Sequence, residues 1–456
     1  METIFALSSG RGKAGVAVIR VSGPLAKEAV IALSGREPEA ARQALFRVLR
    51  DPQSGEVLDQ ALVLWFVGPA SFTGEDCAEF QIHGGPNVVG TVLAALGRLD
   101  GCRAAEAGEF TRRAVENGKF DLTEAEGIGD LIEAETEAQR RQALQQMSGG
   151  LGARCVEWRE RLIKVLAYVE ADIDFVDEDD VPEGLSLSVL PLIVGLSEEI
   201  DALLADGIRG ERVREGIDVA IIGPPNAGKS SLLNWLARRD VAIVSAEAGT
   251  TRDIVEVRLD LAGMPVILAD TAGLRETDNL VEREGVKRAL ARAGSADLTI
   301  LLVGGGQDAN EFLMSGSTGS TSGVEAPSRF DFSLLNKVDL LGAGKESLDS
   351  VPEGFCGISI KSGLGLDDFL ADLERLVQDR FEGREPALIT RQRHRDELSA
   401  CQLHLEQAIE IVQAEGDEVF AAEEIRLALR ALGRLSGRVD VEELLDVVFR
   451  DFCIGK

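Results

Sequence analysis

The length, composition and charge of the chain exclude several classes of protein. Its 456 residues predict about two to four domains, and 45% hydrophobic with 28% charged residues is typical of globular chains. The six cysteines lack CxxC spacing, which argues against zinc and against a disulfide framework. A net charge of −30 disfavours non-specific binding to nucleic acid, so we expect any RNA contact to be local or shared with a more basic partner.

The sequence also contains neither a basic leader nor an apolar run near the roughly 18 residues of a membrane span, which predicts a cytoplasmic protein. Residues 1–118 are predicted to form a mixed α/β domain, because the apolar runs at 15–21 and 60–67 are bounded by turn residues. Helical periodicity follows, and Thr123-Glu-Ala-Glu126 is typical of a capping box.

Strands and helices alternate over residues 216–376, which predicts a doubly wound, mostly parallel sheet with its ligands at the strand ends. The predicted strands lie at 217–222, 255–261, 265–269, 298–303, 332–335 and 355–360. Residues 315–327 are low-complexity and predict a surface loop. Because helical periodicity resumes afterwards, residues 119–215 and 377–456 are predicted to form one helical domain that receives the α/β unit as an insertion. The predicted fold class is therefore multidomain, α+β and α/β.

Two motifs in the inserted unit indicate a guanine nucleotide. Gly223-Pro-Pro-Asn226-Ala-Gly228-Lys229-Ser230 fits the phosphate-binding P-loop, whose amides and lysine contact phosphates and whose hydroxyl holds Mg²⁺. In Asn336-Lys337-Val338-Asp339, the carboxylate of Asp339 can accept from both the ring N–H and the amine of guanine, a donor pair that adenine lacks. Together these motifs predict a GTPase.

Further motifs follow the order found in small GTPases. Gly249-Thr-Thr251-Arg-Asp253 can supply a hydroxyl to Mg²⁺, and Asp270-Thr271-Ala272-Gly273 fits a Walker-B aspartate with a γ-phosphate contact. Ser359-Ile360-Lys361 stands where Ser-Ala-Lys is usual on the purine side.

These motifs do not by themselves identify the catalytic residue. Leu274 occupies the position of the usual water-orienting glutamine, and leucine cannot orient water. The nearby carboxylates Glu276, Glu282 and Glu284 are candidates, although the spacing alone favours helix-surface roles. Asn226 could bind a monovalent cation or could simply stiffen the loop.

Six further strings accompany the GTPase motifs, at residues 18–23, 71–76, 83–86, 108–113, 117–122 and 453–456. With them, the whole chain resembles the MnmE (TrmE) family of tRNA-modifying GTPases. The resemblance implies an N-terminal folate-binding and dimerisation domain and a Ras-like GTPase domain inserted into a helical domain. It further implies that the FAD-dependent partner MnmG (GidA) acts with it at C5 of wobble uridine in certain tRNAs. A methylene or formyl tetrahydrofolate would supply the one-carbon unit for a carboxymethylaminomethyl or aminomethyl group, and tRNA would bind largely through the partner.

The resemblance also assigns residues. Potassium would bind at Asn226, Ser245, Glu247 and Thr250, and Mg²⁺ at Ser230 and Thr251. Glu282 would orient the water once two GTPase domains dimerise. The nucleotide contacts implied are Asn226, Ala227, Gly228, Lys229, Ser230, Ser231, Ser245, Ala246, Glu247, Ala248, Gly249, Thr250, Thr251, Asp270, Thr271, Ala272, Gly273, Asn336, Lys337, Asp339, Ser359, Ile360 and Lys361.

Folate contacts would fall on Arg20, Glu79, Lys119 and Lys456, where a carboxylate suits the pterin and cations suit the glutamyl tail. Cys453, next to the expected folate pocket, is a candidate nucleophile, and a packing or hydrogen-bonding role is the alternative. His83 is predicted to be a loop residue rather than a catalytic one.

The sequence departs from the family at residues 8–16, which replace a Pro-x-Gly-Arg-Gly-Gly pattern, and at 302–306, which lack a frequent Asp. Neither change removes a nucleotide or metal ligand. Two other functions fit parts of the sequence. A ribosome-assembly GTPase of the Era type would need a basic RNA-binding domain, which the acidic C-terminal segment does not supply. A structural dimer that uses GTP only for stability is disfavoured by the candidate catalytic residues.

Overall fold

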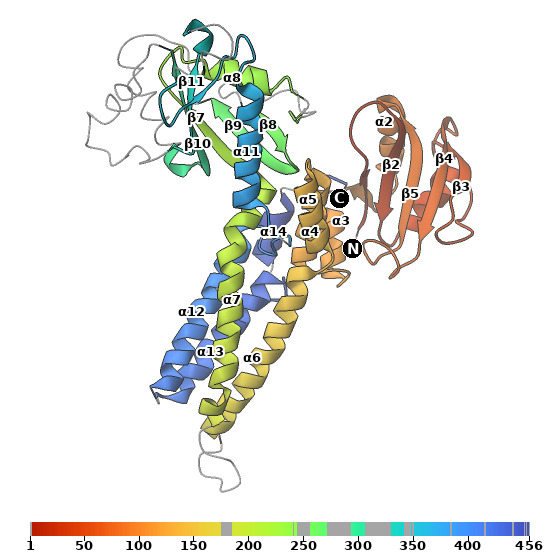
Figure 1. Cartoon of the computed structure of the whole chain (residues 1–456). Helices are drawn as coiled ribbons and strands as arrows, with labels where there is room; N and C mark the ends of the chain where they lie inside the picture. Colours follow the sequence, from red (N-terminus) through yellow and green to blue (C-terminus); the bar gives the residue numbers. More distant parts are fainter. Residues whose placement is uncertain are drawn as a thin grey trace, which may run out of the picture. The chain divides into compact units, whose positions relative to one another are not determined.

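The computed structural model of the chain divides into two compact units (Figure 1). The first comprises Met1–Gly129, Gln146–Glu199 and Asp396–Lys456, and the second comprises Asp130–Gln145 and Ile200–Arg395. The domain boundaries expected near residues 118, 215 and 376 stay predictions. The structure describes residues 2–174, 185–239, 241–243, 256–270, 293–305, 330–341, 348, 351–383, 385–414, 416–439, 442–450, 452, 454 and 455.

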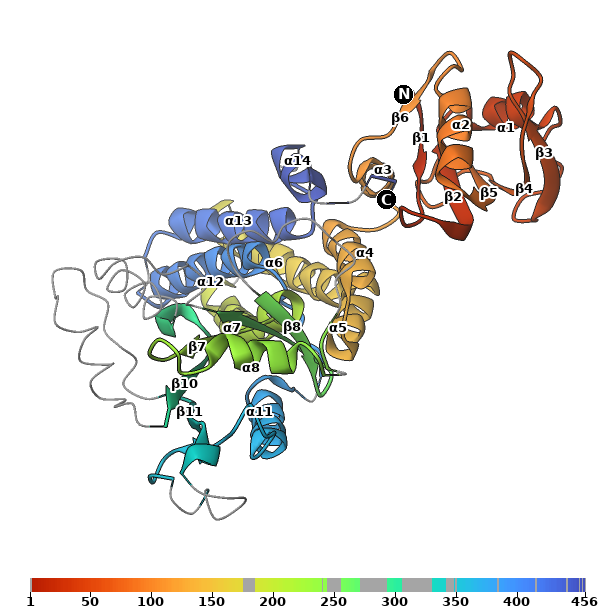
Figure 2. The same cartoon turned by 90° about the horizontal axis from the view of Figure 1, so that it is seen from above.

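The first unit begins with a six-stranded sheet of order β3-β4-β5-β2-β1-β6. Its strands alternate between buried and accessible positions, and Ile19, Val21, Phe80 and Ile82 belong to one buried core with residues of α1 and α2. The two helices lie along this sheet in Figure 2. The opposite sheet face carries Arg20 and Glu79. The elements are β1 (Thr3–Leu7), β2 (Ala14–Ser22), α1 (Ala26–Ser34), β3 (Leu45–Arg50), β4 (Val57–Phe66), β5 (Cys77–Gly84), α2 (Pro86–Leu96), β6 (Cys102–Ala104) and α3 (Glu109–Glu116).

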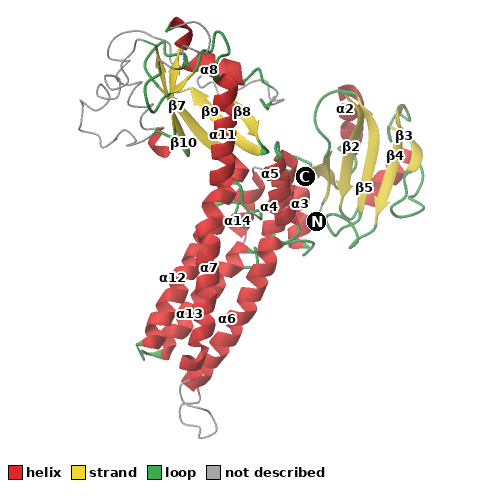
Figure 3. Ribbon diagram, viewed as in Figure 1, coloured by secondary structure: helices red, strands yellow, loops and turns green. Residues whose placement is uncertain are grey.

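Long amphipathic helices make up most of the remaining first unit (Figure 3). In α6, Trp158, Leu162, Val165 and Val169 recur at helical spacing and are buried, which confirms the expected helical periodicity there. Helix α13 packs against α6 through a buried, alanine-rich face. The helices are α4 (Leu122–Glu133), α5 (Glu137–Met147), α6 (Gly150–Asp174), α7 (Leu185–Glu215), α12 (Gln392–Gln413), α13 (Glu418–Leu435) and α14 (Glu442–Arg450), of which α4, α7 and α12 continue into the second unit and α5 lies almost wholly in it.

The start of α4 corrects one expectation. The reciprocal capping bonds join Asp121 and Glu124: the Glu124 amide donates to Asp121 Oδ1 at 2.9 Å, and the Asp121 amide donates to Glu124 Oε2 at 2.7 Å. The box predicted at Thr123 and Glu126 was therefore wrong by two residues. The side chains of Thr123 and Glu126 are buried. Aspartate caps a helix as well as threonine does, and Asp121 precedes Thr123 in the chain, so the helix begins at the aspartate.

The second unit contains another six-stranded sheet, of order β12-β11-β10-β7-β9-β8. Strands β7, β9, β10, β11 and β12 pair in parallel, and β8 is the antiparallel edge strand, as the predicted hairpin requires. Of the strand predicted at 355–360, only the two residues of β12 pair with the neighbouring strand β11. The elements are β7 (Ile217–Ile222), α8 (Lys229–Leu236), β8 (Glu256–Leu261), β9 (Met264–Asp270), β10 (Leu298–Gly304), β11 (Phe332–Asn336), a 3-10 turn (Val338–Leu340), β12 (Cys356–Gly357) and α11 (Leu366–Phe381).

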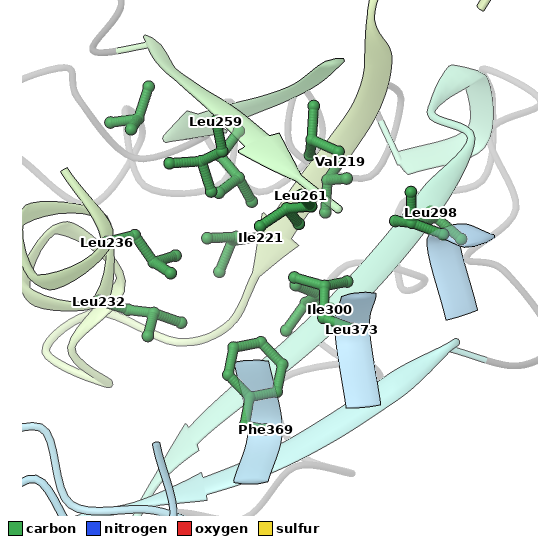
Figure 4. Packing of buried hydrophobic residues seen from close by; sticks show 14 of the residues in the cluster. Val219, Ile221, Leu232, Leu236, Leu259, Leu261, Leu298, Ile300, Phe369 and Leu373 are labelled. Carbon is green, nitrogen blue, oxygen red and sulfur yellow. The ribbon is translucent and has the colours of Figure 1, made fainter. Parts of the chain in front are cut away.

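The core of this sheet fixes where its loops emerge (Figure 4). Ile221 of β7 and Ile300 of β10 lie among Leu232 and Leu236 of α8 and Phe369 of α11, all almost fully buried. Central strands that are buried on both sides are near-continuous apolar runs, as β7 and β10 are. The polar residues that follow each strand therefore gather at one edge of the sheet.

Candidate functional site

The phosphate loop connects β7 to α8. Asn226 and Gly228 adopt positive φ values of 61° and 110°, and α8 begins directly after them at Lys229. The buried Lys229 ammonium donates to the carbonyls of Gly223 at 2.8 Å and Pro224 at 3.0 Å, which holds it inside the loop. The following Ser230 is exposed in the first turn of α8. Amides at a helix N-terminus, a lysine and a hydroxyl are the donor set that suits a phosphate with Mg²⁺.

Asn336, at the end of β11, joins the phosphate loop to the two base-side loops. Its Nδ2 donates to the Ala227 carbonyl at 2.7 Å, and its Oδ1 accepts from the amides of Lys337 at 2.8 Å and Ile360 at 3.3 Å. The Lys337 ammonium in turn donates to the Asn226 carbonyl at 2.9 Å. The structure thus brings together motifs that lie more than a hundred residues apart.

The base-side carboxylate is held by a serine. Ser359 Oγ donates to Asp339 Oδ1 at 2.6 Å, and the Ser362 amide donates to Ser359 Oγ at 3.2 Å. The Ile360 amide donates to Asn336 Oδ1, a backbone contact that does not depend on the unusual side chain, and its expected contact with the base stays a prediction. Lys361 follows it in the same loop. A fixed carboxylate at this position can discriminate guanine from adenine.

Several predicted residues lie outside the described residues. These are the potassium and magnesium candidates at 245–251, the residues of 271–273, Glu282, Cys453 and Lys456. The backbone of Asp270 is described and lies opposite Ile221 in the β7–β9 pairing, at the strand ends next to the phosphate loop. The roles assigned to these residues stay predictions.

A second polar site lies on the N-terminal sheet. Arg20 of β2 and Glu79 of β5 are directly paired in register, and Arg20 Nη2 lies 3.0 Å from Glu79 Oε1. Both side chains are 19% exposed. The guanidinium lies 4.8 Å from the Phe72 ring centroid and 5.8 Å from that of Phe110. An ion pair with an aromatic wall suits a flat, polar heterocycle.

Lys119 contacts the loop of residues 68–76, which also carries Phe72. Its Nζ donates to the Pro69 carbonyl at 2.8 Å, while the Phe72 ring packs 5.6 Å from the ring of Phe120. Gly74 has a φ of 81°, and a Cβ there would lie 3.3 Å from Lys119 Cδ. The loop therefore links Arg20 to Lys119. Residue Phe72 was not among the predicted contacts, although it belongs to the motif at 71–76.

A buried ionic network supports this loop. Glu75 accepts from Arg113 at 3.1 Å and from the Ser22 hydroxyl at 2.7 Å. Arg113 also pairs with Glu109, which in turn pairs with Arg103. Burial disfavours the ionised form of Glu109, but hydrogen bonds from Arg103, the Glu106 amide and Arg113 outweigh it and hold the pKa of Glu109 below its ordinary value.

His83 corrects another expectation, because it lies in strand β5 and not in a loop. Its Nδ1 is 2.8 Å from Asp59 Oδ1, and its backbone amide donates to Asp59 Oδ2 at 2.8 Å. Burial raises the pKa of Asp59, but the two contacts from His83 outweigh it, so that the pKa lies below the ordinary value. The imidazole is 70% exposed on the sheet surface.

The second unit has the sheet order, phosphate loop and guanine loop of a P-loop GTPase. The family description "GTP-binding protein TrmE N-terminus" matches residues 3–119, and "MnmE helical domain" matches residues 122–453. A tRNA modification GTPase MnmE of Parvibaculum lavamentivorans is 55% identical over 456 residues and is covered completely, as is this chain. That of Azorhizobium caulinodans is 51% identical, with 100% of this chain and 99% of the relative covered. The chain belongs to the family of tRNA modification GTPases MnmE.

Solved structures match part of the chain. A variant of Era from Aquifex aeolicus, bound to GDP and aluminium fluoride, is 24% identical over 41% of this chain and 66% of that chain, with a TM-score of 0.27.

Among the described residues, no helix combines the length and the apolar composition that crossing a membrane requires.

Proposed function

We propose that the chain is a potassium-stimulated GTP hydrolase that acts with the FAD-dependent MnmG on C5 of wobble uridine in certain tRNAs. A tetrahydrofolate would supply the carbon for the carboxymethylaminomethyl or aminomethyl group. The observation that carries the proposal is that one chain holds both the guanine-type loop around Asn336 and the Arg20–Glu79 pair on a separate sheet. The membership in the MnmE family supports the same combination.

The chain's own residues would bind GTP as follows. The amides of residues 226–231 and the Lys229 ammonium would hold the phosphates at the N-terminus of α8. Asp339, held by Ser359, would accept from the guanine N–H groups. Ser230 would contribute a hydroxyl to Mg²⁺, which neutralises charge on the β and γ phosphates when bound.

Asn226 would contribute an oxygen ligand to potassium, and the cation would supply the charge that an arginine finger supplies elsewhere. Its positive φ and the Lys337 ammonium on its carbonyl fix this residue in the loop. We propose that a second GTPase domain completes the cation site and that Glu282 orients the attacking water. Hydrolysis per molecule should then rise with protein concentration.

Rates of GTP hydrolysis in KCl and NaCl at equal ionic strength test the cation. The unaltered chain should be faster in KCl by on the order of tenfold or more, and Asn226→Ala should abolish the difference. Asn87→Ala, on an exposed position of α2, is the control and should keep the preference. Equal rates in the two salts would refute the role of Asn226.

Folate recognition would use Glu79 for the pterin N–H and amino groups and the cations Arg20, Lys119 and Lys456 for the remaining polar groups. Titration with 5-formyltetrahydrofolate should show binding that Arg20→Ala weakens by about tenfold or more. Arg50→Ala, an exposed arginine of edge strand β3, should bind normally. Nucleoside mass spectrometry of tRNA completes the test, because unchanged wobble uridines in an Arg20→Ala strain would contradict the proposal.

The accessible face of the N-terminal sheet supports the expected homodimer. Phe46 and Leu62 are directly paired across β3 and β4, and they are 61% and 41% exposed. Val16 of β2 is 58% exposed. Covering these side chains with a second copy would remove apolar area from water. Sedimentation of Phe46→Glu should show a larger fraction of monomer than the unaltered chain.

A further inference from the structure

The guanidinium of Arg20 lies between two phenylalanine rings. Its central carbon is 4.8 Å from the ring centroid of Phe72 and 5.8 Å from that of Phe110. Phe110 is buried in α3, whereas Phe72 is only partly buried and belongs to the loop between β4 and β5. The electron-rich face of an aromatic ring attracts a cation, and the attraction grows as water is removed. The two rings therefore favour one orientation of the Arg20 side chain.

In that orientation, one edge of the guanidinium faces Glu79. Arg20 Nε and Nη2 both donate to the same carboxylate oxygen, Glu79 Oε1, at 3.1 and 3.0 Å. Within the described part of the chain, the third guanidinium nitrogen, Nη1, and the second carboxylate oxygen, Oε2, make no hydrogen bond. The pair thus offers a donor and an acceptor to a ligand that carries both kinds of group on one edge. A pterin, whose amino and ring N–H groups stand beside a carbonyl oxygen, has such an edge.

The loop that carries Phe72 is held by its own hydrogen bonds. The Gly68 amide donates to Asp76 Oδ1 at 2.8 Å, which closes the loop where it begins and ends. Near its middle, the Asn117 side-chain amide donates to the Thr73 carbonyl at 2.7 Å. The backbone of the loop therefore fixes the position of Phe72 without help from a ligand.

The ring of Phe72 also packs against core residues. Its centroid lies 5.6 Å from that of Phe120, with the two ring planes inclined by 56°. Phe72 further packs against the small buried cluster of Ile4, Ala6, Ala105 and Phe110. The ring cannot turn away from the Arg20 guanidinium without losing these apolar contacts.

We propose that Phe72 is a positioning residue of the polar site on the N-terminal sheet, and that it acts by holding the Arg20 guanidinium in the orientation that serves Glu79 and a bound pterin. The inference rests on the folate-binding function proposed above. Arginine is among the side chains that lose the most rotamer freedom when they become ordered. Without the ring, Arg20 regains rotamers that compete with the paired one, and the affinity for the ligand falls.

The test measures the binding of 5-formyltetrahydrofolate to the full-length chain. Phe72→Leu keeps an apolar side chain but removes the ring, and it should weaken binding by about three- to tenfold. Phe72→Tyr restores the ring face and should bind within about twofold of the unaltered chain. Phe420→Leu is the matched control with unchanged affinity, because it makes the same change at a 64% exposed phenylalanine of α13 in the same compact unit.

A double variant separates positioning from direct contact with the ligand. In an Arg20→Ala background, Phe72→Leu should cause little additional loss of affinity, because the residue through which the ring acts is already absent. Losses that add would overturn the inference. Unaltered affinity in Phe72→Leu, or a Phe72→Tyr chain that binds as weakly as Phe72→Leu, would overturn it as well. Absence of folate binding by the unaltered chain would instead overturn the proposed function.

Discussion

Glu109 illustrates how a single residue supports the loop beside the Arg20–Glu79 pair. Its carboxylate accepts from Arg103 and Arg113. Arg113 also pairs with Glu75, in the loop that carries Phe72. The side chains of Glu109 and Arg113 are 12% and 7% exposed, so that each charge depends on the other for compensation. Removing the Glu109 charge takes away a partner that Arg103 and Arg113 share and leaves the buried Arg113 with Glu75.

We therefore expect Glu109→Gln to lower the free energy of unfolding by about 1–3 kcal/mol at pH 7. Because the pKa of Glu109 in the folded chain lies below its ordinary 4.5, its contribution is present above that pH and is lost as the pH falls through the lowered pKa. Urea unfolding at pH 7 and pH 4 should show the difference between the two chains shrinking on acidification. Glu106→Gln is the control, since the Glu106 side chain is exposed; equal stability of Glu109→Gln and the unaltered chain would contradict the expectation.

At the scale of elements, the segments through which the chain enters and leaves the GTPase sheet are fastened together. Asp130 Oδ1 in α4 accepts from Arg214 of α7 at 2.9 Å and from Arg391 at 2.6 Å. Arg395 Nε donates to Glu211 Oε1 at 3.0 Å. At Gly210, α7 approaches the backbone of Ile389 so closely that a Cβ would lie 1.9 Å from its oxygen.

Two glycines in α7 should therefore respond oppositely to alanine. Gly210→Ala should destabilise the second unit by about 1–3 kcal/mol, because the methyl group collides with backbone. Gly195→Ala should stabilise by about 0.5–1 kcal/mol, because the nearest atom, Arg161 Nη2, is 3.9 Å away and alanine favours a helix. Thermal unfolding of both variants measures the two signs. A stabilised Gly210→Ala chain would show that α7 and residue 389 do not touch in solution.

At the scale of the whole molecule, the dominant property is the net charge of −30. Two sites that each contain a cation held by local contacts coexist in this acidic chain, with Lys229 in one and Arg20 in the other. Affinity for a phosphate backbone scales with the number of Lys and Arg residues that displace counterions. An acidic chain is therefore poorly suited to bind tRNA alone.

We expect the isolated chain to retain little tRNA at physiological salt, and a mixture with the proposed partner MnmG to retain more. Filter binding over a series of KCl concentrations measures both, with the slope reporting the number of phosphate contacts. Tight, strongly salt-dependent binding by the isolated chain would contradict the expectation and would place the basic surface on this chain.

The sequence by itself determined what depends on local spacing. The phosphate loop, the Asn336–Asp339 motif and the alternation of strands and helices could be predicted, because amide geometry, base chemistry and periodicity act over a few residues. Two predictions from the sequence were wrong: the cap of α4 lies two residues earlier than predicted, and His83 lies in a strand and not in a loop. Both errors arose because several residue types satisfy the same local pattern.

Only the tertiary structure decided which distant residues meet. The pairing of Arg20 with Glu79, the Phe72 ring against that guanidinium, and the seating of Gly455 on β1 all arise from strand register and close backbone approach. These depend on the packing of segments as far apart as residues 8 and 455, for which a single sequence carries no local signal. The motifs therefore identify the nucleotide site, whereas the polar site around Arg20 and Glu79 is recognisable only in the folded chain.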